Sequence, residues 1–169
     1  GLHLGHQKVL NQAKLRAKKE RLKFGVITFE PIPTMFFNNS INHHRINLIE
    51  QKIFYLKKIK LDFLIIISFN KLFSNMTADN FIKKILVNKL KSKYIFVSRN
   101  FRFGKKRCGN VNMLETFEKK YSYKTIITTP YQKNKKTISS TLIRKNIAKG
   151  NFRNVQIFLG RPWSIKGEV

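Results

Sequence analysis

The pattern of apolar and polar residues along the chain alternates between helical and strand-like periods. Residues 7–22 place Val9, Ala13 and Ala17 near helical spacing with basic residues between them, which predicts a surface helix. Residues 24–29 form a short run of β-branched and aromatic residues, which is typical of a strand. The chain therefore opens with a helix that is followed by a strand.

The alternation continues to the end of the chain. Two prolines, Pro31 and Pro33, predict a loop without regular structure after the first strand. Asn47 and Glu50 have the spacing of a capping box at a helix start, and Thr77 and Ser139 or Ser140 are candidate caps of later helices. We expect helices over 47–60, 77–90, 113–121, 139–150 and 151–160, and strands over 62–69, 94–97 and 124–128.

This order of elements predicts the fold class. Helices that alternate with short apolar strands favour an α/β fold, a Rossmann-like parallel sheet with helices on both faces. The run 62–69 is continuously apolar, as in a strand buried on both faces. Because the pattern opens on a helix, we expect a further strand before Gly1, in the middle of the sheet. Ligands of such sheets bind at the carboxyl ends of the strands, so the site is expected in the loops that follow them.

Composition narrows the classes of protein. The chain has 169 residues, of which 42% are hydrophobic, and 35 Lys and Arg stand against 8 Asp and Glu, a net charge of +27. It is too apolar for a disordered basic tail and has the size of one domain. The charge indicates an anionic partner, and nucleic acid is one candidate. The only aspartates are Asp62 and Asp79, which argues against a paired-carboxylate hydrolase and against a metal site built from protein carboxylates.

Cysteine usage and hydropathy bear on location. The single cysteine, Cys108, excludes an intramolecular disulfide and fits a reducing compartment, so we expect the cytoplasm. The longest apolar run lies within residues 61–69, far short of the ~20 residues that a membrane span needs.

Two histidines and a glycine stand at the start of the first helix. His3 and His6 are three residues apart, which directs both imidazoles to one side of a helix, and Gly5 lets a ligand approach the backbone. Unpaired N–H groups at a helix N-terminus bind anions, so the set suits a phosphate. Surface histidines near a terminus are an equally good interpretation of this motif alone, and a zinc site lacks further ligands.

A second cluster begins the helix predicted over 139–150. Three hydroxyl residues, Ser139, Ser140 and Thr141, precede Arg144 by about one turn. Hydroxyls, N–H groups and a guanidinium at a helix start can bind phosphate together. An ordinary capped helix explains this cluster by itself, but its recurrence with the histidine motif favours phosphate binding.

Together these motifs resemble the HxGH nucleotidyltransferase superfamily. Within it, the chain resembles the FMN adenylyltransferase, or FAD synthetase, module of bacterial bifunctional riboflavin kinase/FAD synthetases. The likeness covers nearly the whole chain and is carried by Gly1–His6, Thr28–Pro33, Asn100–Gly104, Ile138–Arg144 and Leu159–Pro162.

The resemblance implies a reaction and a set of site residues. AMP is transferred from ATP to FMN, which yields FAD and pyrophosphate, and Mg²⁺ is held mainly by phosphate oxygens and water. The implied catalytic residues are His3, His6 and Arg144. The implied ATP contacts are His3, Gly5, His6, Asn100, Arg102, Ser139, Ser140, Thr141 and Arg144. The implied flavin contacts are Phe29, Pro31, Pro33, Phe101, Phe103 and Gly104.

The same resemblance predicts a domain boundary in the chain and the partners of the protein. Residues 1–160 are expected to form the adenylyltransferase domain, and 161–169 to begin the linker or first strand of a riboflavin kinase barrel that these residues do not contain. The expected partners are FMN, ATP and that kinase module, with no membrane and no specific nucleic acid. Two alternatives stay open at this point, a nucleotidyltransferase for another acceptor and a basic module that binds nucleic acid.

Overall fold

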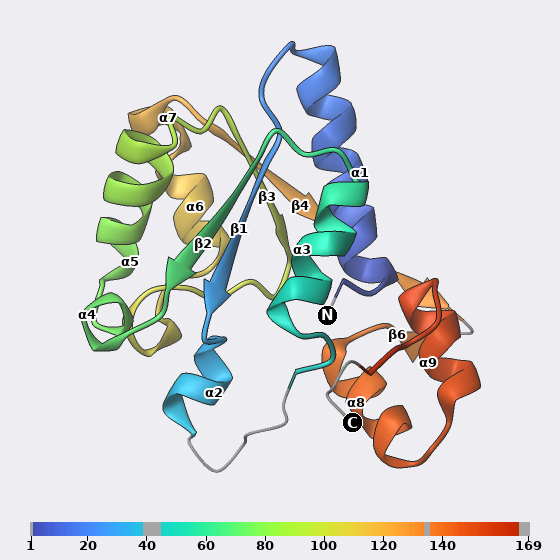
Figure 1. Cartoon of the computed structure of the whole chain (residues 1–169). Coiled ribbons are helices and arrows are strands. Elements are labelled where there is room, and N and C mark those ends of the chain that lie inside the picture. The colour runs from blue at the N-terminus through green and yellow to red at the C-terminus, as the bar shows by residue number, and fades with distance from the viewer. Residues whose placement is uncertain (1, 39–44, 134–135, 166–169) are drawn as a thin grey trace.

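Two pairs of parallel strands form the centre of the molecule (Figure 1). The computed structural model describes residues 2–38, 45–133 and 136–165, without the side chain of Lys136. Strand β1 (Gly25–Glu30) pairs with β2 (Phe63–Ser68), and β3 (Tyr94–Ser98) pairs with β4 (Lys124–Thr128). Both pairs are parallel, so the predicted α/β class is confirmed. No ladder joins the two pairs in the part of the chain that the structure describes, where the predicted single sheet is divided.

Helices surround the strand pairs on both sides, and Figure 1 shows α1 and α3 on one side and α4 to α7 on the other. Helices α8 and α9 form a separate corner below α1 in this view. The described helices are α1 (Leu4–Lys19), α2 (Pro33–Phe37), α3 (Ile49–Lys58), α4 (Lys71–Ser74), α5 (Ala78–Asn80), the π-helix η1 (Phe81–Lys89), the 3₁₀-helix η2 (Lys105–Arg107), α6 (Val111–Thr116), α7 (Glu118–Tyr121), α8 (Ser140–Ala148) and α9 (Phe152–Leu159). A small antiparallel hairpin, β5 (Gln132–Lys133) and β6 (Lys136–Thr137), precedes α8.

Two of the three predicted helix caps are present. The Asn80 N–H donates to Thr77 Oγ1 at 3.2 Å, and the Leu142 N–H donates to Ser139 Oγ at 3.1 Å, as N-caps do. The capping box predicted from Asn47 and Glu50 is wrong. Helix α3 is instead preceded by Leu48, whose N–H donates to the Gln51 side chain at 3.0 Å, because the Asn47 side chain is buried and bonded elsewhere.

Two further predictions of local structure are wrong. The segment after β1 is not without regular structure, since Pro33 occupies the first turn of α2, where its missing N–H costs nothing. Strand β2 is not buried on both faces, since the exposed fractions of Phe63 and Ile66 are 38% and 42%. The structure pairs β2 with β1 alone in the described part of the chain, which leaves its other side accessible.

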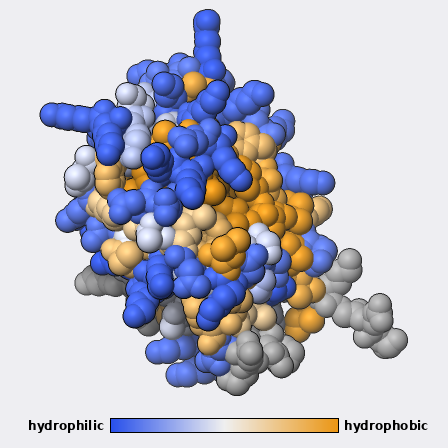
Figure 2. Space-filling model, turned by 90° about the vertical axis from the view of Figure 1, so that its left-hand side faces the viewer, coloured by the Kyte–Doolittle hydropathy of each residue, from blue (hydrophilic) through white to orange (hydrophobic). Residues whose placement is uncertain are grey.

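Exposed apolar side chains gather on this side of the molecule. Figure 2 shows an apolar band across it, bordered by hydrophilic side chains. Leu72 on α4, in the segment after β2, is 85% exposed. Among the described helices none is both long and apolar enough to cross a membrane.

The buried side chains form two clusters. The larger one joins η1, β3 and α6, and Ile82 and Leu114 at its centre are fully buried. The smaller one joins α8 and α9 through Ile143, Val155 and Leu159, which are also fully buried. The segment after α9 packs on this second cluster through Trp163, whose ring stacks on Phe152 at 5.7 Å between centroids.

Segment 161–165 also contacts α3. Arg161 lies over the Tyr55 ring at 3.7 Å from the centroid, and Trp163 Nε1 donates to the Ile46 carbonyl at 2.9 Å. The predicted division of the chain after residue 160 stays a prediction, and its last residues, 166–169, lie outside the described residues.

We expect the substitution Leu114→Ala to lower the free energy of unfolding by about 2–5 kcal/mol, because it leaves a cavity in the larger core. Leu72→Ala, which removes the same atoms from an 85% exposed position, is the matched control and is expected to change it by less than about 0.5 kcal/mol. Urea denaturation measures both, and equal losses would contradict this assignment of the core.

Candidate active site

The first helix begins at the carboxyl end of the strands, as Figure 1 shows. His3 precedes α1, and its side chain is buried beneath the first turn, 7% exposed. His6, in that turn, is exposed, and the two imidazole centroids are 3.9 Å apart. A Cβ at Gly5 would lie 3.0 Å from His3 Nδ1, so any larger residue would require the His3 ring to shift by a few tenths of an ångström. The expected pairing of the two imidazoles is therefore present.

The start of α8 lies beside the start of α1. A Cβ at Gly5 would lie 3.6 Å from the Ile138 carbonyl oxygen, which precedes α8 by two residues. Gln7 Nε2 donates to the Leu159 carbonyl at 2.8 Å and to the Leu2 carbonyl at 2.9 Å. These bonds hold the first turn of α1 against the corner formed by α8 and α9. Two helix N-termini thus meet at one place, which concentrates unpaired N–H groups there.

A pocket of about 280 Å³ opens where these helices meet the end of β1. Its described charged side chains are Arg45, Lys52 and Arg144 on the basic side and Glu30 on the acidic side, and the His6 imidazole lies beside them. Glu30 forms an ion pair with Arg45, so the remaining groups leave the pocket positively charged. The described residues that line it are His6, Glu30, Ile32, Thr34, Arg45, Ile46, Asn47, Ile49, Lys52, Ser140 and Arg144.

Burial lowers the pKa of two of these cations. Burial lowers the pKa of Arg144 from its usual value, but an arginine guanidinium keeps its proton near neutral pH. Burial also lowers the pKa of Lys52, an effect that Glu30 opposes and Arg45 adds to. The charge of these side chains therefore acts in a partly desolvated place, where its attraction for an anion is stronger than at the surface.

The structure brings three of the predicted phosphate-binding residues into this pocket, namely His6, Ser140 and Arg144. Ser139 lies beside them, and its hydroxyl caps α8. Thr141 is exposed, and its Oγ1 accepts a hydrogen bond from Arg144 Nη2 at 3.4 Å.

The residues predicted to contact flavin near β1 lie next to the pocket but do not line it. The Phe29 ring packs on Phe69 and Phe73, with centroids 5.8 and 5.6 Å away. Pro31 and Pro33 are half-buried, whereas their neighbours Ile32 and Thr34 line the pocket.

The loop after β3 forms a separate group. The rings of Phe101 and Phe103 stack at 5.4 Å between centroids, and Phe103 is buried in the larger core. Gly104 has a φ of +74°, and a Cβ there would lie 2.6 Å from the Ala78 backbone nitrogen, so the loop packs closely on the start of α5. Asn100 and Arg102 are exposed. The described structure does not place these residues in the pocket, and their role stays a prediction.

Sequence reasoning assigns no site role to eight described residues of the pocket, among them Glu30, Arg45, Asn47 and Lys52. Glu30 belongs to the motif Thr28–Pro33, but its residue type and spacing alone indicate no role. Lys52 lies one turn into α3, but the chain has many lysines, and nothing in the sequence around Lys52 distinguishes it from them as a site residue. Only the fold shows that this lysine is half-buried and faces Thr28.

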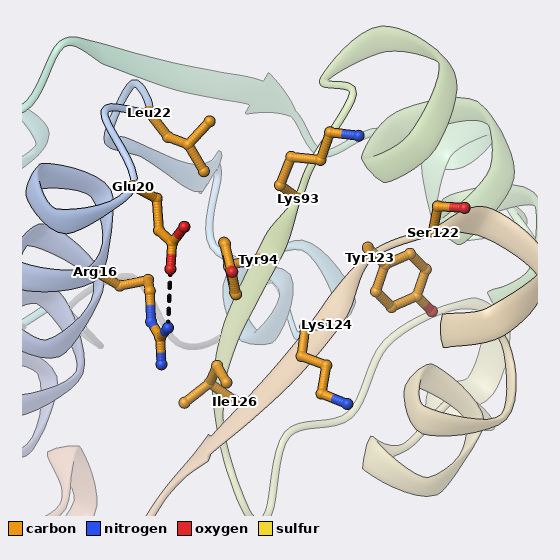
Figure 3. A pocket seen from close by; sticks show the side chains of 9 residues that line it. All are labelled: Arg16, Glu20, Leu22, Lys93, Tyr94, Ser122, Tyr123, Lys124 and Ile126. Carbon is orange, nitrogen blue, oxygen red and sulfur yellow. Dashed lines mark hydrogen bonds and ion pairs between the residues drawn. The ribbon is translucent and has the colours of Figure 1, made fainter.

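A larger hollow, of about 530 Å³, lies at the opposite ends of the strands (Figure 3). Figure 3 shows Tyr94, where β3 begins, beside an Arg16–Glu20 ion pair of 3.0 Å, while the side chains of Lys93 and Lys124 extend away from that pair. No predicted site residue lines this hollow. Because ligands of parallel sheets bind at the carboxyl ends of strands, we identify the smaller pocket as the candidate active site. Within the described residues no three His, Cys, Asp or Glu side chains form a metal-binding group.

Comparisons with known proteins agree on a family. The profile of the FAD synthetase family matches residues 1–142. The chain is 42% identical to the bifunctional riboflavin kinase/FMN adenylyltransferase of Buchnera aphidicola subsp. Schizaphis graminum and 34% identical to that of Haemophilus influenzae. Both alignments cover the whole chain but 54% and 55% of the relatives. The chain thus spans about half the length of these relatives.

A solved structure has the same fold. It is titled as a macrolide-efflux protein from Streptococcus pneumoniae, and it matches 96% of this chain and 61% of its own with a TM-score of 0.83 and 26% identity. The structural likeness supports the α/β fold of this chain. The family profile extends over both helix starts that form the pocket, and on this match the chain belongs to the FAD synthetase family.

Proposed function

We propose that this chain catalyses FMN adenylyl transfer, ATP + FMN → FAD + pyrophosphate, as part of a longer enzyme. The observation that carries the proposal is the basic pocket in which the N-termini of α1 and α8 meet beside β1. Its charge and its N–H donors suit phosphates, and membership of the FAD synthetase family favours FMN over other acceptors and over a role in binding nucleic acid.

The reaction needs no covalent intermediate with the protein. An oxygen of the FMN phosphate forms a bond to the α-phosphorus of ATP, and the bond from that phosphorus to the β-phosphate oxygen breaks. Pyrophosphate leaves with the electron pair of that bond. A phosphate monoester has a second pKa near 6, so the attacking oxygen is already an anion near neutral pH. The work of the protein is to position the two substrates and to stabilise charge.

The ATP phosphates are assigned to the N-termini of α1 and α8. His6 and Ser140 supply hydrogen-bond donors, Arg144 supplies a planar cation, and backbone N–H groups of both first turns add to them. Ser139 keeps the first turn of α8 in place by capping it, while Thr141 contacts Arg144. We assign Gly5 a packing role that lets His3 support His6.

The flavin and adenosine groups are assigned to the loops after β1 and β3. Phe29, Pro31 and Pro33 offer flat apolar surface beside the pocket. In the second loop Phe101 does so, stacked on the buried Phe103, and Gly104 packs this loop against the start of α5. Asn100 and Arg102 are exposed in that loop and are assigned to ATP. The pocket of about 280 Å³ lies at the lower end for a small-molecule site, so in this proposal it holds the phosphates and the rings lie outside it.

Magnesium enters the proposal together with ATP. Among the described lining residues Glu30 is the one carboxylate, and it is engaged by Arg45, so these residues fit a metal whose oxygen ligands come mainly from phosphate and water. Mg²⁺ neutralises part of the charge of the triphosphate. We further propose that a riboflavin kinase module is the natural partner of this chain and that the protein works in the cytoplasm.

His3 contributes a neutral imidazole to the proposed site. Burial, with a further contribution from the neighbouring His6, lowers the pKa of His3 from 6.5 to about 3. At neutral pH the buried ring is therefore uncharged, and it packs against His6 without adding a buried positive charge.

We expect the protein to lose stability as the pH falls below about 6.5, in part because of His3. The unfolded chain binds a proton at this residue near pH 6.5, whereas the folded chain resists it down to about pH 3. Above pH 6.5 this residue is neutral in both states and leaves the free energy of unfolding unchanged. Below pH 6.5 it lowers the free energy of unfolding by at most about 1.4 kcal/mol per pH unit. Urea denaturation between pH 5 and 7.5 should give a flatter profile for His3→Gln, while parallel profiles would contradict the assignment.

We expect His6→Ala to lower the rate of FAD formation by about 10²–10³-fold, since it removes a preorganised donor from the phosphates. Asn11→Ala, an exposed change further along α1, is the control and should leave the rate unchanged. The assay follows FAD from FMN and Mg-ATP by chromatography. A wild-type protein that folds but forms no FAD would refute the proposed function.

A further inference from the structure

The pocket has a second wall, which consists of Glu30, Arg45, Asn47 and Lys52 and to which the histidine motif and the hydroxyl–arginine motif contribute nothing. Two contacts join it to β1. Lys52 Nζ donates to Thr28 Oγ1 at 2.9 Å, and Arg45 forms an ion pair with Glu30. An ammonium group has three N–H donors, and the bond to Thr28 uses one of them while it fixes the direction of the side chain.

Two buried donors in this wall have no acceptor among the residues that the structure describes. Arg45 Nε and Asn47 Nδ2 make no hydrogen bond with any described residue. The orientation of the Asn47 amide is set from outside the pocket, because Arg161 Nη2 donates to Asn47 Oδ1 at 3.0 Å. A guanidinium can only donate, so the amide oxygen faces Arg161 and the amide N–H groups face away from it. Buried donors without acceptors destabilise a protein, and a ligand oxygen would relieve them.

The charges of this wall favour an anion at Lys52. Its carboxylate, Glu30, is balanced by Arg45, which leaves the Lys52 ammonium as the uncompensated charge. Lys52 is half-buried, so its attraction for a phosphate is less screened than that of a surface lysine.

We propose that Lys52, with the Asn47 amide beside it, binds the 5′-phosphate of FMN and directs it at the ATP phosphates held by α1 and α8. This inference rests on the proposed function. The wall is assigned to the acceptor because Glu30 is followed directly by the loop in which Ile32 and Thr34 line the pocket, and this loop is assigned to the flavin. A flavin held there presents its phosphate to the residues at the end of β1.

The proposal gives Lys52 a part in substrate selection. Its contact is made to the phosphate, so it distinguishes FMN from flavins that carry no phosphate. It also places a positive charge beside two phosphates that repel one another as they approach. Lys52 is thus a substrate-binding residue that raises the affinity for FMN and leaves the affinity for ATP to the other wall.

The test compares Lys52→Met with wild type in the complete gene product, with FAD formation as the readout. Methionine keeps the apolar stem and removes the ammonium. Loss of one charge-assisted hydrogen bond is expected to lower kcat/KM for FMN roughly 10- to 100-fold. The KM for ATP is expected to stay within about twofold, and Lys52→Arg, which keeps the charge, is expected to recover part of the loss. Inhibition by lumiflavin, a flavin without a phosphate, should be the same in wild type and Lys52→Met.

Lys57→Met is the matched control, since it makes the same change at an exposed position of the same helix and is expected to behave as wild type. A Lys52→Met enzyme with wild-type kinetics overturns the inference and leaves the proposed function intact. An increase in the KM for ATP, or an equal loss of lumiflavin inhibition, also overturns it, because Lys52 would then act on the other substrate or on the flavin ring. Absence of FAD formation in the wild type overturns both proposals.

Discussion

The hydrogen bonds of Gln7 hold together the two parts of the chain that make the pocket. Its side-chain amide reaches the Leu159 carbonyl at the end of α9, so the first turn of α1 cannot move independently of the α8–α9 corner. The small core of that corner in turn fixes where α8 begins. His6 and Ser140, which are more than a hundred residues apart in the sequence, therefore line one pocket. Without this tie, each helix start would be an isolated anion site.

The close approach of the two helix starts determines the chemistry of the pocket. Each N-terminus carries a partial positive charge and unpaired N–H groups, and these act over only about one turn. Two of them serve one ligand only if the backbones come close, and Gly5 lies at this approach, where a Cβ would be 3.6 Å from the Ile138 carbonyl oxygen and 3.0 Å from the His3 ring. The neutral state of His3 follows from the same packing, because a charged ring there would be costly in a buried place that already attracts anions.

The sequence predicts the pocket residues that belong to the two phosphate-binding motifs, but it does not predict the second wall of the pocket. His6, Ser140 and Arg144 were found because a helix start with donors is recognisable from residue type and spacing. Lys52, Arg45 and Asn47 were not, because their function depends on which elements face them, and neither propensity nor spacing reports this. Phe103 illustrates the reverse case, since an aromatic residue in a nucleotide-like loop proves to be buried in the core. The continuously apolar sequence of β2 predicts burial on both faces, but Phe63 and Ile66 are exposed, because the burial of a strand depends on how many elements pack beside it.

The net charge of +27 does not by itself determine which anionic ligand the protein binds. Most of the lysines are exposed, where salt screens each charge beyond roughly 8 Å and where a single pair contributes little. Together they form a field that attracts any polyanion without selecting one. Lys52 and Arg144 differ from them by burial, which lowers the pKa of each and strengthens its interaction with a bound phosphate. Selectivity for a nucleotide therefore depends on where a few cations lie, and the number of cations bears mainly on the rate at which anionic ligands arrive.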